Sequence, residues 1–62
     1  MKNKYTVVVK SGKNTRRISV ESVNPMEAHK EVYMRIKNSE EVDSITDDTG
    51  DVVFNIRQGF SE

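Results

Sequence analysis

The sequence predicts an α+β fold, a single ββαββ domain in which one helix packs on one face of a four-stranded antiparallel sheet. Three observations point to this class. Only the segment Asn24 to Lys37 has a helical pattern, the flanking segments are rich in β-branched and aromatic residues, and turn residues divide each flank into two strands. The 62 residues suffice for one domain with a small core, and residues 1–3 and 58–62 are expected to fray.

The first hairpin begins with K-Y-T-V-V-V-K at residues 4–10. Its three successive valines predict a strand that is apolar on both faces and therefore central. A turn follows at residues 11–14, where Gly12 or Asn14 is expected to take positive φ, and residues 15–23 alternate as a second strand. The side chains expected to face the core are Tyr5, Val7 and Val9 on the first strand and Ile18 and Val20 on the second.

The predicted helix has a well-marked start. The side chain of Asn24 can accept from a free backbone N–H, and Pro25 suits the first helical position, where its missing N–H costs nothing. Glu27 completes the spacing of a capping box and brings a negative charge to the positive end of the helix. The helix is expected to end near residue 38 or 39. Its apolar stripe, which the sheet should cover, consists of Ala28, Val32 and Ile36.

The second hairpin carries a weaker strand at residues 42–47, with Ile45 as its anchor. The acidic segment at residues 47–51 has the form of a type I turn in which Gly50 takes the left-handed conformation and makes a bulge. Residues 51–57 form the last predicted strand. Its inward side chains are expected to be Val52, Phe54 and Ile56.

Two strand orders are compatible with this pattern. A helix that carries the chain from the second strand across the first to the third gives the order 4-3-1-2, with all strands antiparallel. The order 2-1-4-3, with the first and fourth strands parallel, is the alternative, because the run Val52-Val53-Phe54 is also strongly apolar.

The charges are divided along the chain although they cancel in total. Residues 1–37 hold nine of the ten Lys and Arg residues, and residues 38–62 hold seven of the ten Asp and Glu residues. This division predicts a basic surface around the first hairpin and an acidic surface around the second. The alternative is that the two halves pair their charges or only solvate the surface.

Nucleic acid binding is one function that the basic half suggests. Four cations lie on or beside the first hairpin, where they could contact phosphates. The outward strand positions carry no aromatic residue on which a base could stack, which argues against a sheet surface that reads RNA. The residues of this alternative site are Lys10, Lys13, Arg16 and Arg17.

The sequence predicts no metal site and no cofactor. Asp47, Thr49 and Asp51 have the first ligand spacings of an EF-hand loop. The glycine that should follow Asp51 is replaced by Val52, however, and Gln58 stands where the bidentate glutamate belongs. Asp43 and Asp48 are the other acidic residues that a metal site here could use. Asx-type hydrogen bonding in a hairpin turn is the ordinary explanation for such acidic residues.

Catalysis is not expected either. His29 is the single histidine, cysteine is absent, and no serine or threonine stands beside a recognisable base. A lone histidine at the edge of a buried stripe is usually a packed, partly solvated residue. We therefore predict that the protein is not an enzyme.

The preferred prediction is a small protein-interaction module with a regulatory or accessory role. Several helix residues lie outside the core stripe and combine Tyr, Met and Lys, a composition common at contact surfaces. The competing interpretation is that the core is wider than the stripe and that these residues cap its rim. The predicted protein-binding residues are Met26, Lys30, Tyr33, Met34 and Lys37.

A homodimer is also expected, since an open sheet face or edge can join two copies, and a basic hairpin can face the acidic hairpin of its twin. No apolar run of signal-peptide or transmembrane length follows the basic N-terminus, which favours a cytoplasmic location without membrane contact. A short, cysteine-free, highly charged chain without a catalytic motif is typical of bacterial or phage proteins that act by binding another protein.

Overall fold

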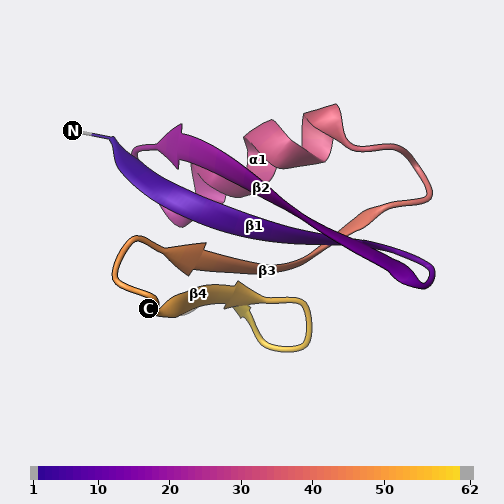
Figure 1. Ribbon diagram of the computed structural model, residues 1–62. Helices are drawn as coiled ribbons and strands as arrows, with labels where there is room; N and C mark the ends of the chain where they lie inside the picture. Colours follow the sequence, from indigo (N-terminus) through magenta and orange to yellow (C-terminus); the bar gives the residue numbers. More distant parts are fainter. Residues whose placement is uncertain (1, 61–62) are drawn as a thin grey trace.

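A computed structural model describes residues 2–60 and shows an α+β fold with one helix and an antiparallel sheet (Figure 1). The strand order is β2-β1-β3-β4-β5, and every neighbouring pair is antiparallel. The order 4-3-1-2 for the first four strands is thus confirmed, and the order 2-1-4-3 is wrong. The elements are β1 (Asn3–Ser11), β2 (Asn14–Ser22), α1 (Pro25–Arg35), β3 (Glu41–Asp47), β4 (Val52–Asn55) and β5 (Gly59–Phe60).

The prediction of four strands was wrong, because the structure has a fifth. Gly59 and Phe60, which the sequence placed in a fraying tail, pair with Asn55 and Phe54 as β5. The turn before them is held by Asn55, whose side-chain oxygen accepts from the N–H of Arg57 (2.8 Å) and whose carbonyl accepts from the N–H of Gln58 (3.0 Å). A strand of two residues has no periodicity, so the pattern of the sequence did not reveal it.

The first hairpin forms as expected around a two-residue turn. Ser11 and Asn14 are its closing pair, and Gly12 has φ +61°, as the first central residue of a type II′ turn requires. Positive φ therefore falls on Gly12 and not on Asn14. The register is continuous from this turn to the pair Asn3 and Ser22.

Helix α1 starts where the sequence predicts. Asn24 is extended (φ −157°) and its side-chain oxygen accepts from the N–H of Glu27 at 2.8 Å. Pro25 is the first helical residue. The helix ends at Arg35, a few residues before the predicted end, because Ile36 turns to an extended conformation (ψ 162°) as the C-cap. Within residues 2–60, no helix is long and apolar enough to cross a membrane.

The core lies between α1 and the strands β1, β2 and β3. Ala28 and Val32 are fully buried, and Ile36 packs against them at the edge, so the predicted stripe does cover the sheet. Burying a side chain of the size of valine stabilises the fold by about 1.5–3 kcal/mol, which makes this layer the main support of so short a chain. The buried apolar residues are Tyr5, Val7, Val9, Val20, Ala28, Val32, Val42 and Ile45.

The predicted inward face of the last long strand was correct only in part. Phe54 packs against the core opposite Ile45, but Val52 is 52% exposed. The register shifts between Ile45 and Thr46, which brings Val52 opposite Thr46. Residues opposite each other share a face, so this bulge moves Val52 to the open face. Ile56, also predicted to face inward, lies beyond β4 in the turn and is 45% exposed.

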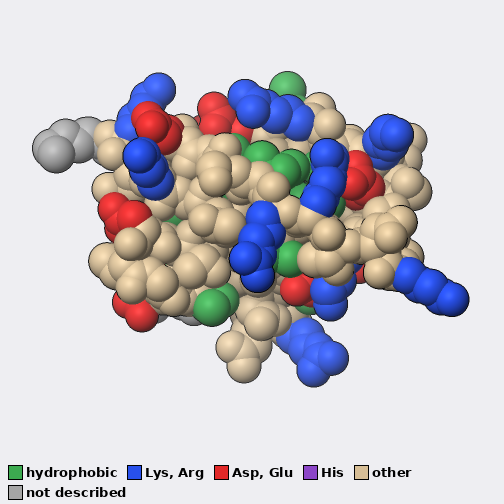
Figure 2. Space-filling model, in the orientation of Figure 1, with side chains coloured by type: hydrophobic (Ala, Val, Ile, Leu, Met, Phe, Trp, Pro, Cys, Tyr) green, Lys and Arg blue, Asp and Glu red, His purple; other side chains and the backbone are tan. Residues whose placement is uncertain are grey.

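The face of the sheet away from α1 is open. In Figure 1 the strands lie in front of the helix, so this face is turned toward the reader. Figure 2 shows Lys, Arg, Asp and Glu side chains spread over it with small apolar areas between them. No large apolar area gathers on this side.

Candidate protein-binding surface

An aromatic cluster connects α1 to the last two strands. The ring of His29 lies 5.0 Å from that of Phe54 and 5.8 Å from that of Phe60, both edge-on, and 6.0 Å from that of Tyr33 in a stacked arrangement. Phe54 and Phe60 are themselves 4.7 Å apart. Such pairs contribute about 0.5–1.5 kcal/mol beyond the area they bury. His29 is thus used in packing, and the cluster holds β5 against the helix.

The helix residues next to this cluster remain open to solvent. Tyr33 is 66% exposed, Met34 85%, Met26 57% and Phe60 41%. Met26 and Tyr33 are more than half exposed, so most of their surface is open to solvent even where Tyr33 stacks on His29. We call this surface the helix patch and define it as Met26, His29, Lys30, Tyr33, Met34 and Phe60.

Two shallow, mainly apolar hollows lie in the helix patch. One, of about 200 Å³, is lined by His29, Lys30, Tyr33 and Met34. The other, of about 220 Å³, is lined by Asn24, Pro25, Met26 and Phe60. Since Phe60 of the second hollow contacts His29 of the first, the two hollows adjoin.

The structure brings together four of the five residues predicted for protein binding, namely Met26, Lys30, Tyr33 and Met34. Lys37 lies beyond the end of the helix and shares a smaller hollow with Tyr33. Sequence reasoning missed the contribution of His29 and Phe60. The one available signal was an aromatic residue directly after Gly59, at a position that the pattern assigned to a tail.

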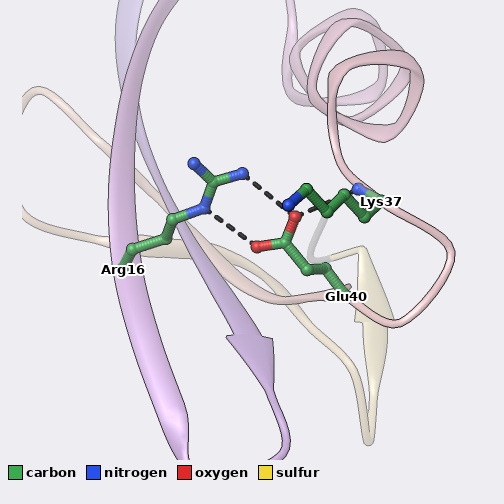
Figure 3. A network of polar contacts seen from close by, with 3 residues as sticks. All are labelled: Arg16, Lys37 and Glu40. Atoms are coloured by element: carbon green, nitrogen blue, oxygen red, sulfur yellow. Dashed lines mark hydrogen bonds and ion pairs between the residues drawn. The ribbon is translucent and has the colours of Figure 1, made fainter.

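The loop after α1 is fixed to the first hairpin by Glu40 (Figure 3). Its carboxylate accepts from Arg16 Nε at 2.9 Å and Arg16 Nη2 at 3.1 Å, and from the backbone N–H of Lys37 at 3.0 Å. The hydrogen bond from Lys37 is the main cause that lowers the pKa of Glu40, and Arg16 adds to it. A bidentate pair of this kind joins the basic half of the chain to the acidic half.

The four cations predicted for nucleic acid binding do not form one surface. Arg16 pairs with Glu40, and Lys10 pairs with Asp43 at 3.4 Å. Arg16 stands opposite Val9, on the helix side, whereas Arg17 stands opposite Val8, on the open side. Lys13 lies in the turn between β1 and β2.

The acidic turn uses its own oxygens. One oxygen of Asp47 accepts from the N–H of Thr49 at 3.0 Å, from the hydroxyl of Thr49 at 2.6 Å and from the N–H of Asp51 at 3.0 Å. The hydroxyl of Thr49 is the main cause that lowers the pKa of Asp47. Gly50 has φ +93°, the left-handed conformation expected of it. Among residues 2–60, no group of three or more His, Asp or Glu side chains is placed to hold a metal ion.

Comparisons of this chain with protein-family models, with curated proteins and with solved structures find no match. Any functional assignment therefore rests on the surface itself. Its most distinctive feature is the helix patch, where apolar side chains are exposed to solvent beside two hollows.

Proposed function

We propose that this protein is a small non-enzymatic interaction module, regulatory or accessory in role, that binds another protein through the helix patch. The observation that carries the proposal is the exposure of Tyr33, Met34 and Met26 beside two adjoining apolar hollows. Gathered apolar side chains on a soluble domain usually mark a contact surface, and Tyr and Met are well suited to it.

The side chains of the helix patch indicate which side chains a partner should present to it. Each hollow is of a size to take an apolar side chain from a bound protein. Lys30 lines the first hollow, and its ammonium group has only a long contact of 3.9 Å with Glu27. Such an exposed pair is weak, so Lys30 can turn to a carboxylate of the partner. We expect a partner that presents apolar side chains next to an acidic residue.

Affinity capture from the native host tests this proposal. The double variant Tyr33→Ser, Met34→Glu should lose the partner that the wild type retains, because it removes exposed apolar area without touching the core. Val52→Ser is the matched control, since Val52 is also about half exposed but lies on the open face. Retention of the same partner by the double variant, with its fold intact, would contradict the proposal.

Nucleic acid binding through the first hairpin is the second candidate, and the pairing of Lys10 and Arg16 with carboxylates gives it less support. Lys13→Glu with Arg17→Glu is the variant that tests it without breaking the contact between Arg16 and Glu40. If this candidate is correct, the wild type shifts duplex or single-stranded DNA at low salt and the variant does not. Nuclease treatment of the captured material separates the two functions.

A further inference from the structure

The helix patch lies beside β4 and β5, and on the opposite side of the molecule the sheet ends in a long outer strand, β2. β2 is the outer strand of the sheet over nine residues, whereas the opposite edge, β5, has only two. An edge strand presents unpaired N–H and C=O groups to which another strand can bind. Of the two edges within residues 2–60, β2 is therefore the one with room for a bound strand.

The hairpin register identifies which backbone groups of β2 point outward. A two-residue turn is closed by a hydrogen-bonded pair, here Ser11 and Asn14, and bonded pairs then alternate along an antiparallel ladder. The even-numbered residues of β2 are thus bonded to β1. The outward N–H and C=O groups belong to Thr15, Arg17, Ser19 and Glu21.

Two hollows between β2 and the helix layer lie at opposite ends of this edge. The hollow at the start of β2, about 330 Å³, is lined by Ser11, Asn14, Arg16, Lys37, Ser39 and Glu40. The hollow at the end of β2, about 250 Å³, is lined by Lys2, Glu21, Ser22, Val23, Asn24, Glu27 and Glu31. In the first hollow Arg16 is paired with Glu40, so Lys37 leaves a net positive charge there. The second hollow holds three carboxylates and one lysine and is therefore negative. The edge is therefore basic at its start and acidic at its end.

We propose that the outer edge of β2 binds an extended strand of a partner protein, antiparallel to β2, whose first residues are basic, whose middle is apolar and whose last residues are acidic. An antiparallel strand begins beside the acidic end of β2 and ends beside the basic end, so its charges complement both. The apolar middle lies beside Ile18, which is only half-buried in the free protein. The bound strand would then pair with β2 in the antiparallel direction, as all neighbouring strands of the sheet do.

β2 itself has this sequence of properties, since R-R-I-S-V-E runs from basic through apolar to acidic. If a strand of this sequence pairs with β2 so that the two Ser19 residues lie opposite each other, Arg17 of each strand lies opposite Glu21 of the other. Ile18 of each strand then lies opposite Val20 of the other. A capped synthetic peptide T-R-R-I-S-V-E-S is therefore the probe, and T-E-E-I-S-V-R-S, with reversed charges, is its control.

The binding experiment is a titration of the full chain with each peptide, followed by amide resonances and hydrogen exchange. The first peptide should slow exchange at Arg17, Ser19 and Glu21, and the reversed peptide should bind at least about tenfold more weakly. Ser19→Pro is the decisive variant. It removes an outward N–H and leaves the bonds to β1 in place, so it should lower the affinity at least about tenfold while the fold persists.

Three results would overturn the inference. These are equal binding of both peptides, undiminished binding by a folded Ser19→Pro variant, or protection confined to amides outside β2. Sedimentation of the protein alone gives a further check. A wild-type dimer that Ser19→Pro converts to a monomer would show that a second copy of this chain, and not a separate partner, occupies the edge.

Discussion

Arg16 and Glu40 lie 24 residues apart in the sequence and form a bidentate ion pair, with Nε to Oε2 at 2.9 Å and Nη2 to Oε1 at 3.1 Å. The pair ties the loop after α1 to β2, on the helix side of the sheet. The side chain of Glu40 is only 10% exposed, and its carboxylate also accepts from the N–H of Lys37. One side chain thus holds both the end of the helix and the hairpin beneath it.

Glu40→Gln should lower the stability of the protein at neutral pH. The pKa of Glu40 is lowered from its ordinary 4.5, so the folded state favours the ionised carboxylate. The stabilisation is therefore complete above that value and is lost as the pH falls through the lower pKa of the folded state. Urea unfolding across this acid range should show a steeper loss for the wild type than for Glu40→Gln. Parallel curves would mean that the carboxylate adds nothing to folding.

Asp47→Ala should destabilise the turn between β3 and β4, because three hydrogen bonds end on one oxygen of Asp47. The pKa of this group is lowered from 3.8, so its stabilisation is also present above that value and disappears in acid. Asp48→Ala, in the same turn, is the control and should leave the unfolding midpoint nearly unchanged. Equal midpoints for the two variants would refute the role of Asp47.

The sequence predicted the parts of this fold that depend on local pattern. The cap at Asn24, the glycine turn at Gly12 and the buried stripe of α1 each follow from neighbouring residues. These signals, together with the path of the helix, were enough to favour the correct order of the first four strands.

The parts that could not be predicted depend on contacts between distant segments. The exposure of Val52 follows from a one-residue register shift against β3, which does not interrupt the apolar run in the sequence. β5 is held in place by contacts of the Phe60 ring with the rings of His29 and Phe54, which are distant in the sequence or on another element. The helix patch depends on the same contacts. Its exposed helix residues could be named from the sequence, but His29 and Phe60 could not, because their part in the patch comes from the contact between the two rings.

Val32→Ala should cost about 2–3 kcal/mol of folding free energy. Val32 is fully buried against the sheet. Removing its two methyl groups loses the free energy gained by burying them and also leaves a cavity in the core. Domains of this size have little stability in reserve, and the midpoint of urea unfolding should fall clearly. Met34→Ala, on the same helix but 85% exposed, should stay within about 0.5 kcal/mol of the wild type. Similar losses in both variants would place the core elsewhere.

Phe60→Ala should release β5 from the helix without unfolding the domain. Phe60 is 41% exposed and belongs to a strand of two residues, so its removal should cost about 1 kcal/mol, whereas Phe54→Ala, nearer the core, should cost about 2–4 kcal/mol. In Phe60→Ala, hydrogen exchange should rise at Gly59 and stay low in β1.

The His29 ring resonances supply the second measurement, because this ring packs edge-on against both phenylalanines. Loss of Phe60 should remove its ring-current shift from His29 and weaken binding through the helix patch, since Phe60 lines one of the two hollows. Unchanged His29 shifts in a folded Phe60→Ala variant would show that β5 does not meet the helix in solution, and the helix patch would then be limited to α1.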